Sequence, residues 1–543
     1  MTSAATRKLP QLILGARDAN PSTNPKAYQR PARPLFDVAA TREIEHEAQD
    51  RLPAHTLMRR AGLSTAKLAM ALAPHADTYW IACGPGNNGG DGLEAAVHLR
   101  QWGKSPIVTW LGTPAKAPVD AGRSLQRAID AGVTLSDEPP ERADFCVDAL
   151  LGLGASQATS VRQLDGRMAA WIERINASSA GVLAVDVPTG LNADTGHASA
   201  LCVRAKATLS LMTLKPGMFT AQGRDACGDI WLDDLDDLQA LSAPRAPAIR
   251  SEREPSAWLA GAPEFHARAH ASHKGSFGDV LVIGGAAGMT GAALLAAKSA
   301  LHFGAGRVFV MLLDGGSMAV DSEQPEVMFR PFDDDKFAEQ FNTLYSQMTV
   351  VCGSGGDTAV QQPLATILAS NANTVLDADA LNAIAFDQKL ALLLCARSAR
   401  GARTVLTPHP LEAARLLATT TEQVQHNRLA AATAITRQFQ CTVVLKGSGS
   451  VIAAPGQTPV INPTGNAALA TAGTGDVLAG MVGARLAGLA RLTRTSDTIG
   501  ATDSTAFVAA CEAVYRHGQA ADQWPMHRAL TASRLARAVG AAN

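Results

Sequence analysis

Short apolar runs alternate with helical stretches along most of the chain. In the first half, residues 41–49 and 56–70 predict two helices, the second with apolar residues near helical spacing. Helical stretches then separate apolar runs of strand length at residues 79–83, 107–111, 144–150 and 182–188. Because strands that alternate with helices form parallel sheets, this pattern predicts an α/β domain.

The second half shows the same alternation. A helix rich in small residues is predicted at 290–301, and strands are predicted at 278–285, 308–313, 348–352, 374–376, 404–406 and 441–445. Residues 243–255 contain three prolines and mixed charge, which predicts a linker between the two regions. We therefore expect two α/β domains, at residues 36–242 and 256–543.

Residues 1–35 differ from the rest, being rich in Pro, Arg, Ala and Asn with Asp18 as their only acid. The apolar run 12–14 is too short for the core of a secretory signal. The composition predicts a disordered tail. A weaker alternative is an organelle transit peptide, because such segments are also poor in acids and contain arginine.

The composition of the 543 residues, with 47% hydrophobic and 18% charged, is that of a globular chain with a large core. A net charge of -1 gives no electrostatic reason to expect nucleic acid or an acidic membrane as partner. No apolar run reaches the roughly 20 residues of a membrane span. Eight cysteines without a C-x-x-C pair suggest neither a zinc site nor a disulfide framework, and the expected location is the reducing cytoplasm.

A glycine-rich segment, residues 84–92, joins the predicted strand 79–83 to a helix. Strand, glycine-rich turn and helix form the phosphate-binding arrangement of doubly wound α/β folds. Five glycines in nine residues exceed what packing alone suggests. Asn87, Asn88 and Asp91 add side-chain groups that could orient a sugar, an amide or a cation. The alternative is a decorated loop without a ligand.

Acidic side chains end two of the predicted strands of the first half. Asp148 precedes Leu-Leu-Gly-Leu-Gly154, and Asp186 precedes Val-Pro-Thr-Gly190. Because strand ends of an open parallel sheet converge on one crevice, both acids could meet Asn88 and Thr189 there. Such oxygen ligands suit K⁺ or Mg²⁺, and an acid at that place could also move a proton. Each aspartate alone is more often a satisfied loop carboxylate.

Polar groups also follow strands of the second half, at 377–382, 407–412 and 446–450. Lys446, followed by two glycines and two serines, could hold phosphates by charge and by backbone N–H groups. The alternative for this segment is a surface hairpin turn. His409 stands between two prolines, which favours a contact role over that of a satisfied core histidine.

The last motif is Gly473-Thr-Gly-Asp476, at the start of an apolar helical run. A helix that begins there directs free N–H groups and the positive end of its dipole at a bound phosphate. A carboxylate at such a site repels phosphate, unless it moves a proton or meets a metal that the phosphates bring. The alternative is that Asp476 only caps the helix.

The first-half motifs, Gly-Asn-Asn-Gly-Gly-Asp-Gly, Asp-Ala-Leu-Leu-Gly-Leu-Gly and Asp-Val-Pro-Thr-Gly, resemble the NAD(P)H-hydrate epimerase domain. That resemblance implies a Rossmann-like three-layer fold that interconverts the R and S epimers of hydrated NADH or NADPH. It implies K⁺ ligation by Asn88, Asp148 and Thr189, and a catalytic or orienting role for Asp186. It also implies substrate contacts by Asn87, Asn88, Gly89, Gly90, Asp91, Gly152, Leu153, Gly154, Ala155, Ser156, Gln157, Ala158 and Asp186.

The second-half motifs, including Asp-Ala-Asp-Ala-Leu-Asn, Thr-Pro-His-Pro and Ala-Thr-Ala-Gly-Thr-Gly-Asp, resemble the ADP-dependent NAD(P)H-hydrate dehydratase, a ribokinase-like domain. The resemblance implies dehydration of the S epimer with ADP and Mg²⁺, yielding AMP and phosphate, in an assembly of several subunits. Asp476 would be catalytic. Substrate contacts would come from Ala292, Gly355, His409 and Asp476, and nucleotide contacts from Lys446, Gly447, Ser448, Gly449, Ser450 and Gly475.

A different function uses the same motifs. A ribokinase-type small-molecule kinase would employ Asp476 and its glycine turn, fused to a first half that binds nucleotide or protein without chemistry. The acids Asp148 and Asp186 beside Asn88 argue against that alternative, since a pure binding module has little use for two acids at a cation site. The residues leave open ADP against ATP, and NADH hydrate against NADPH hydrate.

Overall fold

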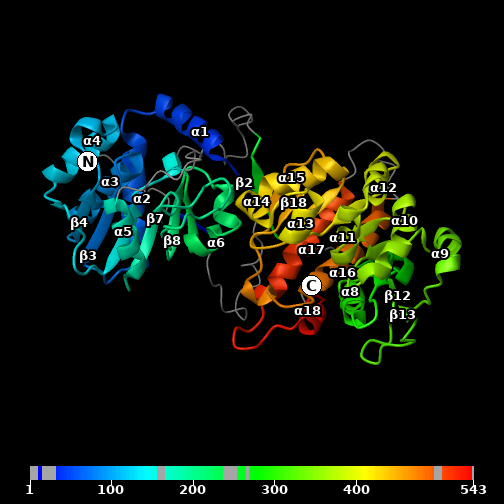
Figure 1. Ribbon diagram of the computed structural model, residues 1–543. Coiled ribbons are helices and arrows are strands. Elements are labelled where there is room, and N and C mark those ends of the chain that lie inside the picture. The colour runs from blue at the N-terminus through cyan, green and yellow to red at the C-terminus, as the bar shows by residue number, and fades with distance from the viewer. Residues whose placement is uncertain are drawn as a thin grey trace. The chain divides into compact units, whose positions relative to one another are not determined.

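The computed structural model describes residues 10–14, 32–155, 166–235, 254–264, 268–493 and 504–540. The chain forms two compact units (Figure 1). Of the described residues, 10–14 and 34–257 belong to the first unit, and 32–33 and 258–540 belong to the second. All but the last two residues of the expected linker, 243–255, lie outside the described part. Within the expected tail, Gln11–Leu14 and Arg33–Leu35 are strands β1 and β2, so the tail is not disordered throughout.

The described residues of the first unit form an eight-stranded sheet in the order β1-β9-β8-β7-β6-β3-β4-β5. Its strands after β1 are β3 (Thr78–Cys83), β4 (Ser105–Trp110), β5 (Thr134–Ser136), β6 (Phe145–Ala149), β7 (Gly181–Val185), β8 (Ala207–Leu211) and β9 (Asp229–Asp233). Its helices are α1 (Val38–Arg51), α2 (Thr56–Leu72), α3 (Asn87–Gln101), α4 (Val119–Asp130), α5 (Gly166–Ala177) and α6 (Gly223–Cys227). The pairings are parallel except that of β1 with β9, as the alternation of strands and helices predicts.

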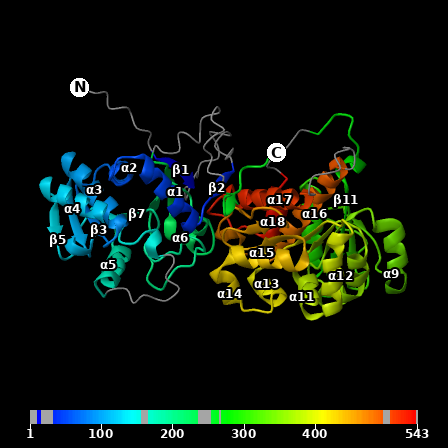
Figure 2. The same cartoon turned by 90° about the horizontal axis from the view of Figure 1, so that it is seen from above.

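Alternate residues of β3 enter two different cores. Ile81 packs in the cluster that includes residues of α2 and α3, while Trp80 packs in the cluster that includes α5. Successive side chains of a strand point to opposite faces, so the sheet is covered on both sides. Figure 2 shows α3 and α5 on opposite sides of these strands. The first unit is therefore three-layered, and its parallel strands end together at one edge.

The second unit contains an eleven-stranded sheet in the order β13-β12-β11-β14-β15-β16-β17-β18-β19-β10-β2. The strands not yet given are β10 (Ala257–Leu259), β11 (Asp279–Gly284), β12 (Arg307–Leu312), β13 (Met328–Phe329), β14 (Thr349–Cys352), β15 (Thr374–Leu376), β16 (Thr404–Leu406), β17 (Thr442–Leu445), β18 (Val451–Ala453) and β19 (Val460–Ile461). From β13 to β17 the pairings are parallel, and β17-β18-β19 are antiparallel.

Helices cover this sheet on both sides. They are α8 (Thr290–His302), α9 (Asp334–Gln340), α10 (Gln361–Ala369), α11 (Ala378–Phe386), α12 (Gln388–Ala399), α13 (Pro410–Leu416), α14 (Thr421–His426), α15 (Arg428–Phe439), α16 (Thr474–Thr493), α17 (Thr505–Asp522) and α18 (Ala532–Ala538). In Figure 2, α16 and α17 lie on one side of this unit and α12, α13 and α15 on the other. The predicted α/β fold is thus confirmed for both halves.

Helices α8 and α16 pack with unusually close backbones. A Cβ atom added at Gly480 would lie 2.0 Å from the carbonyl oxygen of Ala296. The hydroxyl of Ser299 in α8 donates to the carbonyl of Val477 in α16 at 2.8 Å. Because α16 begins at the predicted Gly-Thr-Gly-Asp motif, this contact fixes where the motif lies against the sheet.

We expect Gly480→Ala to lower the free energy of unfolding of the second unit by about 1–3 kcal/mol, since the added methyl overlaps the α8 backbone. Gly488→Ala on the same helix is the matched control, because the nearest atom to its added Cβ is 3.8 Å away. That control should be stabilising by about 0.5–1 kcal/mol, through helix propensity alone. Thermal or urea unfolding measures both, and equal effects would contradict the close-packing account.

Candidate active sites

The glycine-rich segment of the first unit is largely helical. Helix α3 begins at Asn87 and has no side-chain cap, so the N–H groups of its first turn face outward after Gly86. The sequence predicts more glycines here than packing requires, and this prediction is wrong for four of the five glycines. A Cβ at Gly84, Gly89, Gly90 or Gly92 would lie within 3 Å of another atom, and only the one at Gly86 would have open space around it.

Asp148 and Thr189 meet, as the convergence of strand ends predicts. The Thr189 hydroxyl donates to Oδ1 of Asp148 at 2.7 Å, and the Thr189 N–H donates to Oδ2 at 2.8 Å. Leu150 N–H donates to Oδ1 at 3.2 Å. The carboxylate is fully buried, and burial raises its pKa to about 6 against the lowering effect of these donors. A cation here would relieve that cost of burial.

Asn88 reaches the same edge of the sheet from α3. A Cβ at Gly152 would lie 3.2 Å from Oδ1 of Asn88, and Nδ2 of Asn88 is buried without a hydrogen-bond partner in the described chain. The Thr189 hydroxyl lies 3.4 Å from the carbonyl oxygen of Leu151. Amide, carboxylate, hydroxyl and carbonyl oxygens with a single negative charge fit an alkali cation. The described residues contain no group of three or more His, Cys, Asp or Glu that could hold a metal.

The predicted binding segment 152–158 is described only in part. Leu153–Ala155 is a short 3-10 turn just after β6, in which Leu153 is buried and Gly154 exposed. Gly152 lies against Asn88, so the start of this segment lies beside the N-terminus of α3. Ser156, Gln157 and Ala158 lie outside the described residues.

Asp186 follows β7 and is held in a left-handed backbone conformation, with φ 67°. A non-glycine residue there is strained, and such strain is common at functional sites. Its Oδ1 accepts a hydrogen bond from Nζ of Lys215 at 2.5 Å. The ammonium is fully buried and also donates to Ser210 Oγ at 3.2 Å and the Leu211 carbonyl at 3.0 Å. Asp186 therefore enters the site as half of a buried ion pair.

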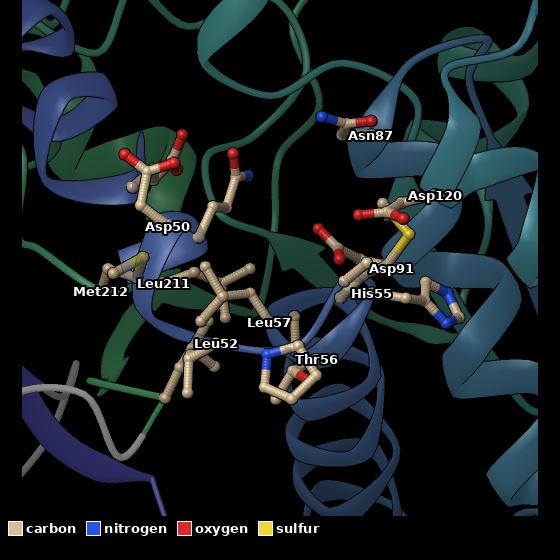
Figure 3. A pocket seen from close by; sticks show the side chains of 17 residues that line it. Asp50, Leu52, His55, Thr56, Leu57, Asn87, Asp91, Asp120, Leu211 and Met212 are labelled. Atoms are coloured by element: carbon tan, nitrogen blue, oxygen red, sulfur yellow. The ribbon is translucent and has the colours of Figure 1, made fainter. Parts of the chain in front are cut away.

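A pocket of about 370 Å³ opens beside these groups. In Figure 3 the Asp91 carboxylate points into it, with Leu57 beside it and Asn87 at its rim. Glu45 also lines the pocket, and burial followed by the charge of Asp186 raises the pKa of Glu45 to about 7. Burial, then Asp186 and Glu45, raise the pKa of Asp91 well above its ordinary value. Acids whose pKa values are raised in a pocket suit proton transfer.

In the second unit, Asp476 lies in the first turn of α16. Burial, followed by the charge of Asp377, raises its pKa to about 6, against the opposing charge of Lys446. A carboxylate that caps a helix accepts backbone N–H bonds, which lower its pKa. Helix α16 begins at Thr474, so Asp476 is its third residue and does not stand at the capping position before the helix. Its raised pKa suits proton transfer.

Lys446 extends toward the start of α16. Its Nζ bonds to Oδ1 of Asp377 at 2.7 Å and lies 3.9 Å from Oε2 of Glu412. A Cβ at Gly475 would lie 3.4 Å from the same Nζ, so the missing side chain leaves room for the ammonium. Thr407 Oγ1 also donates to Asp377 at 2.7 Å. The structure thus brings Lys446, Gly475 and Asp476 together, as the phosphate-site hypothesis requires.

Residues 446–450 connect the antiparallel strands β17 and β18. The segment is therefore a hairpin turn, which is the alternative to a phosphate-binding segment in the sequence analysis. Gly447 and Gly449 take positive φ values of 140° and 59°. Ser450 Oγ donates to the Gly447 carbonyl at 3.2 Å. Lys446 at the base of this turn is largely buried in its ion pair, whereas an ordinary surface turn would leave it in water.

His409 has a structural role that we did not predict. It caps α13, where its Nδ1 accepts from the N–H groups of Leu411 and Glu412 at 3.1 and 3.3 Å. Its Nε2 lies 3.1 Å from Oε1 of Glu412. The ring is half-exposed, and burial, then Lys446, lower its pKa. A neutral imidazole on the rim of the Lys446 cluster can still contact a ligand.

Ala292 and Gly355 lie together at the start of α8. A Cβ at Gly355 would lie 2.9 Å from Cβ of Ala292, and the Gly355 φ of 61° favours glycine. Ala286 N–H donates to the Gly355 carbonyl at 2.7 Å. These two residues form a smooth backbone wall that a planar group could approach.

Sequence reasoning missed Lys215 and Glu45 in the first unit and His517 in the second. Lys215 could have been found, since it follows a strand, as Asp186 does. His517 Nε2 bonds to the carbonyl of Thr474 at 2.9 Å and supports the start of α16. Glu45 has no distinguishing signal among the charged residues of α1.

Comparison with known proteins finds matches to both halves of the chain. Residues 54–217 match the family described as YjeF-related protein N-terminus, and residues 280–540 match NAD(P)H-hydrate dehydratase. A bifunctional NAD(P)H-hydrate repair enzyme from Coxiella burnetii is 32% identical over 83% of this chain and 90% of its own. The Escherichia coli enzyme of that name is also 32% identical, over 89% and 88%. The chain belongs to the family of bifunctional NAD(P)H-hydrate repair enzymes.

One further relative and one solved structure extend the comparison. The Leishmania braziliensis bifunctional NAD(P)H-hydrate repair enzyme is 33% identical over 90% of this chain and 89% of its own. A Bacillus subtilis ADP/ATP-dependent NAD(P)H-hydrate dehydratase, co-crystallised with ATP and Mg²⁺, is 29% identical, with a TM-score of 0.40 over 51% of this chain and 92% of its own. In the described residues of this family member, no helix is long and apolar enough to cross a bilayer.

For this repair-enzyme chain we expect Thr189→Val to lower the free energy of unfolding of the first unit by about 1–3 kcal/mol, because buried Asp148 loses a hydroxyl donor. Thr189→Ser keeps the hydroxyl and should unfold close to the parent protein. Urea unfolding of the three proteins measures the difference. If the valine variant unfolds like the parent, the hydroxyl does not hold Asp148.

Proposed function

We propose that this chain restores hydrated NADH and NADPH in two steps on one polypeptide. Residues 36–242 interconvert the R and S epimers, and residues 256–543 dehydrate the S epimer with ADP as phosphoryl donor, releasing AMP and phosphate. Membership of the bifunctional repair family over both units supports this pairing. A kinase fused to an inert module would leave the first-unit match unexplained.

The observation that carries the dehydratase assignment is the position of Asp476. Hydration at C6 of the nicotinamide ring leaves a hydroxyl, which is a poor leaving group in water. A base that takes the proton of this hydroxyl lets its oxygen attack a phosphoryl group, and phosphate then leaves. Asp476, with its raised pKa and its place at a helix start beside Lys446, is that base.

The groups around Asp476 bind the phosphates and stabilise their negative charge. The ammonium of Lys446 and the N–H groups of the Gly473–Gly475 turn stabilise negative charge on the transferring group. Asp377 holds Lys446 by its 2.7 Å ion pair, which keeps the ammonium aimed at the start of α16. The hairpin Gly447–Ser450 holds the adenine nucleotide. Mg²⁺ accompanies ADP and neutralises phosphate charge when bound.

The donor set of the first unit supports K⁺ as the resident ion. Asn88, Asp148 and Thr189 offer oxygen atoms, and the buried Asp148 carboxylate has no lysine or arginine among the groups that shift its pKa. When bound, K⁺ would supply a fixed positive charge beside the substrate phosphates and the start of α3. Asn87 to Asp91 and the segment from Gly152 contact the nucleotide, and Asp186 acts in acid–base chemistry.

Asp476→Asn should lower ADP-dependent dehydration of the S epimer by about 10²–10⁴-fold, the range typical of a lost general base. Epimerisation by the same protein should be unchanged, which provides an internal control. ADP should still raise the melting temperature of the variant. Asp335→Asn, an exposed acid on α9, is the matched control and should keep full activity.

The pH dependence gives a second test of the same base. Because the pKa of Asp476 is raised to about 6, the active, ionised form is lost as the pH falls through that value. Dehydration kcat/KM should therefore fall below about pH 6. Near-normal dehydration by Asp476→Asn, or a flat profile down to pH 5, would rule out Asp476 as the base.

A further inference from the structure

The epimerase step needs two proton-transfer groups, and Asp186 supplies one. This inference rests on the proposed function. C6 of the hydrated ring carries both the hydroxyl and the ring nitrogen N1. To invert C6, the C–O bond must break while N1 donates its electron pair, and water must then add to the opposite face. One group has to protonate the departing oxygen, and another has to take a proton from the incoming water.

Glu45 is placed for the first of these tasks. It belongs to α1, while Asp186 belongs to the loop after β7, so the two carboxyl groups reach the site from different elements. Glu45 lines the 370 Å³ pocket together with Asn87 and Asp91. In the described part of the chain no side chain or backbone group is hydrogen-bonded to its carboxyl group, which leaves that group to a ligand.

Asp186 is hydrogen-bonded to Leu211, and Leu211 lines the pocket. The N–H of Leu211 donates to Oδ1 of Asp186 at 3.3 Å, and Lys215 holds the same oxygen. Both bonds fall on Oδ1, which leaves Oδ2 for the substrate. The ion pair with the buried Lys215 ammonium fixes the orientation of the Asp186 side chain.

The three acids of this pocket differ in their surroundings. The pKa of Asp91 is raised well above its ordinary value, first by burial and then by the charge of Asp186. The pKa of Glu45 is about 7, raised first by burial. Acids whose pKa values are pushed apart take different roles in acid–base sites. The titratable and charged groups that line the pocket or act on Glu45 are Arg42, Asp50, His55, Asp91, Asp120, Asp186 and Lys215.

We propose that Glu45 is a catalytic residue of epimerisation and works as a pair with Asp186. In one direction the Glu45 carboxyl group gives its proton to the C6 hydroxyl, the C6–O bond breaks, and water leaves as N1 forms a double bond to C6. A water molecule then adds to the other face of C6 and gives a proton to Asp186. In the reverse direction the two residues exchange roles, and solvent returns the proton between turnovers.

The test uses the full-length protein and purified R epimer without ADP, so that dehydration does not run. Glu45→Gln should lower kcat for epimerisation by about 10²–10⁴-fold, with little change in KM. Glu47→Gln, an exposed acid on the same helix, is the matched control. Glu45→Asp keeps a carboxyl group and should be more active than Glu45→Gln. Circular dichroism and the melting temperature of each variant report on folding.

Solvent enriched in oxygen-18 gives an independent readout. Each enzymatic inversion should place one solvent oxygen at C6, because the original oxygen leaves as water. An inverted product that keeps its original oxygen would contradict the C–O cleavage. Epimerisation by a folded Glu45→Gln at near-normal rate, or equal losses in the Gln and Asp variants, would overturn the role of Glu45. Absence of epimerisation by the parent protein would overturn the proposed function instead.

Discussion

Both candidate sites depend on burying carboxylates where parallel strands end. Such a strand end offers backbone groups and converging side chains but little water, so an acid placed there must be paired or partly protonated. Asp148 is held by Thr189, while Asp186 and Asp377 each pair with a lysine that is buried or nearly so. Burial raises the pKa values of Glu45, Asp91 and Asp476, which suits these acids to proton transfer.

The two lysine–aspartate pairs serve different ends on the same principle. In the first unit Lys215 is fully buried and bonds to one oxygen of Asp186, which fixes the orientation of that carboxylate. In the second unit the lysine is the group proposed to contact the phosphates. Lys446 reaches the start of α16, and Asp377 holds it there by an ion pair. In the proposed function, proton transfer at the nicotinamide ring uses the carboxylate of the Lys215–Asp186 pair, and phosphoryl transfer from ADP uses the ammonium of the Lys446–Asp377 pair.

The sequence predicted most parallel strands because apolar runs of strand length are bounded by glycine and polar residues. It missed β5, β9 and β13. It also missed β8, where buried Thr208 and Ser210 interrupt the apolar run and donate to the carbonyls of Cys227 and Thr213. The convergence of Asp148 with Thr189 followed from topology, whereas the grouping of Lys446 with Gly475 followed from the family resemblance. The contacts Lys215–Asp186 and Lys446–Asp377 could not be predicted, since they join residues 29 and 69 positions apart through side-chain directions that only the fold sets.

The central claim, two complementary activities on one chain, is tested most directly with an equal mixture of both epimers of hydrated NADH, excess ADP and the full-length protein. Absorbance at the reduced-nicotinamide wavelength should return for the whole mixture. With Asp186→Asn it should return at the normal rate for the S half only, and the R half should follow at the uncatalysed rate of epimerisation. A parent protein that stops after one half, or an Asp186→Asn protein that repairs both halves equally fast, would contradict the account.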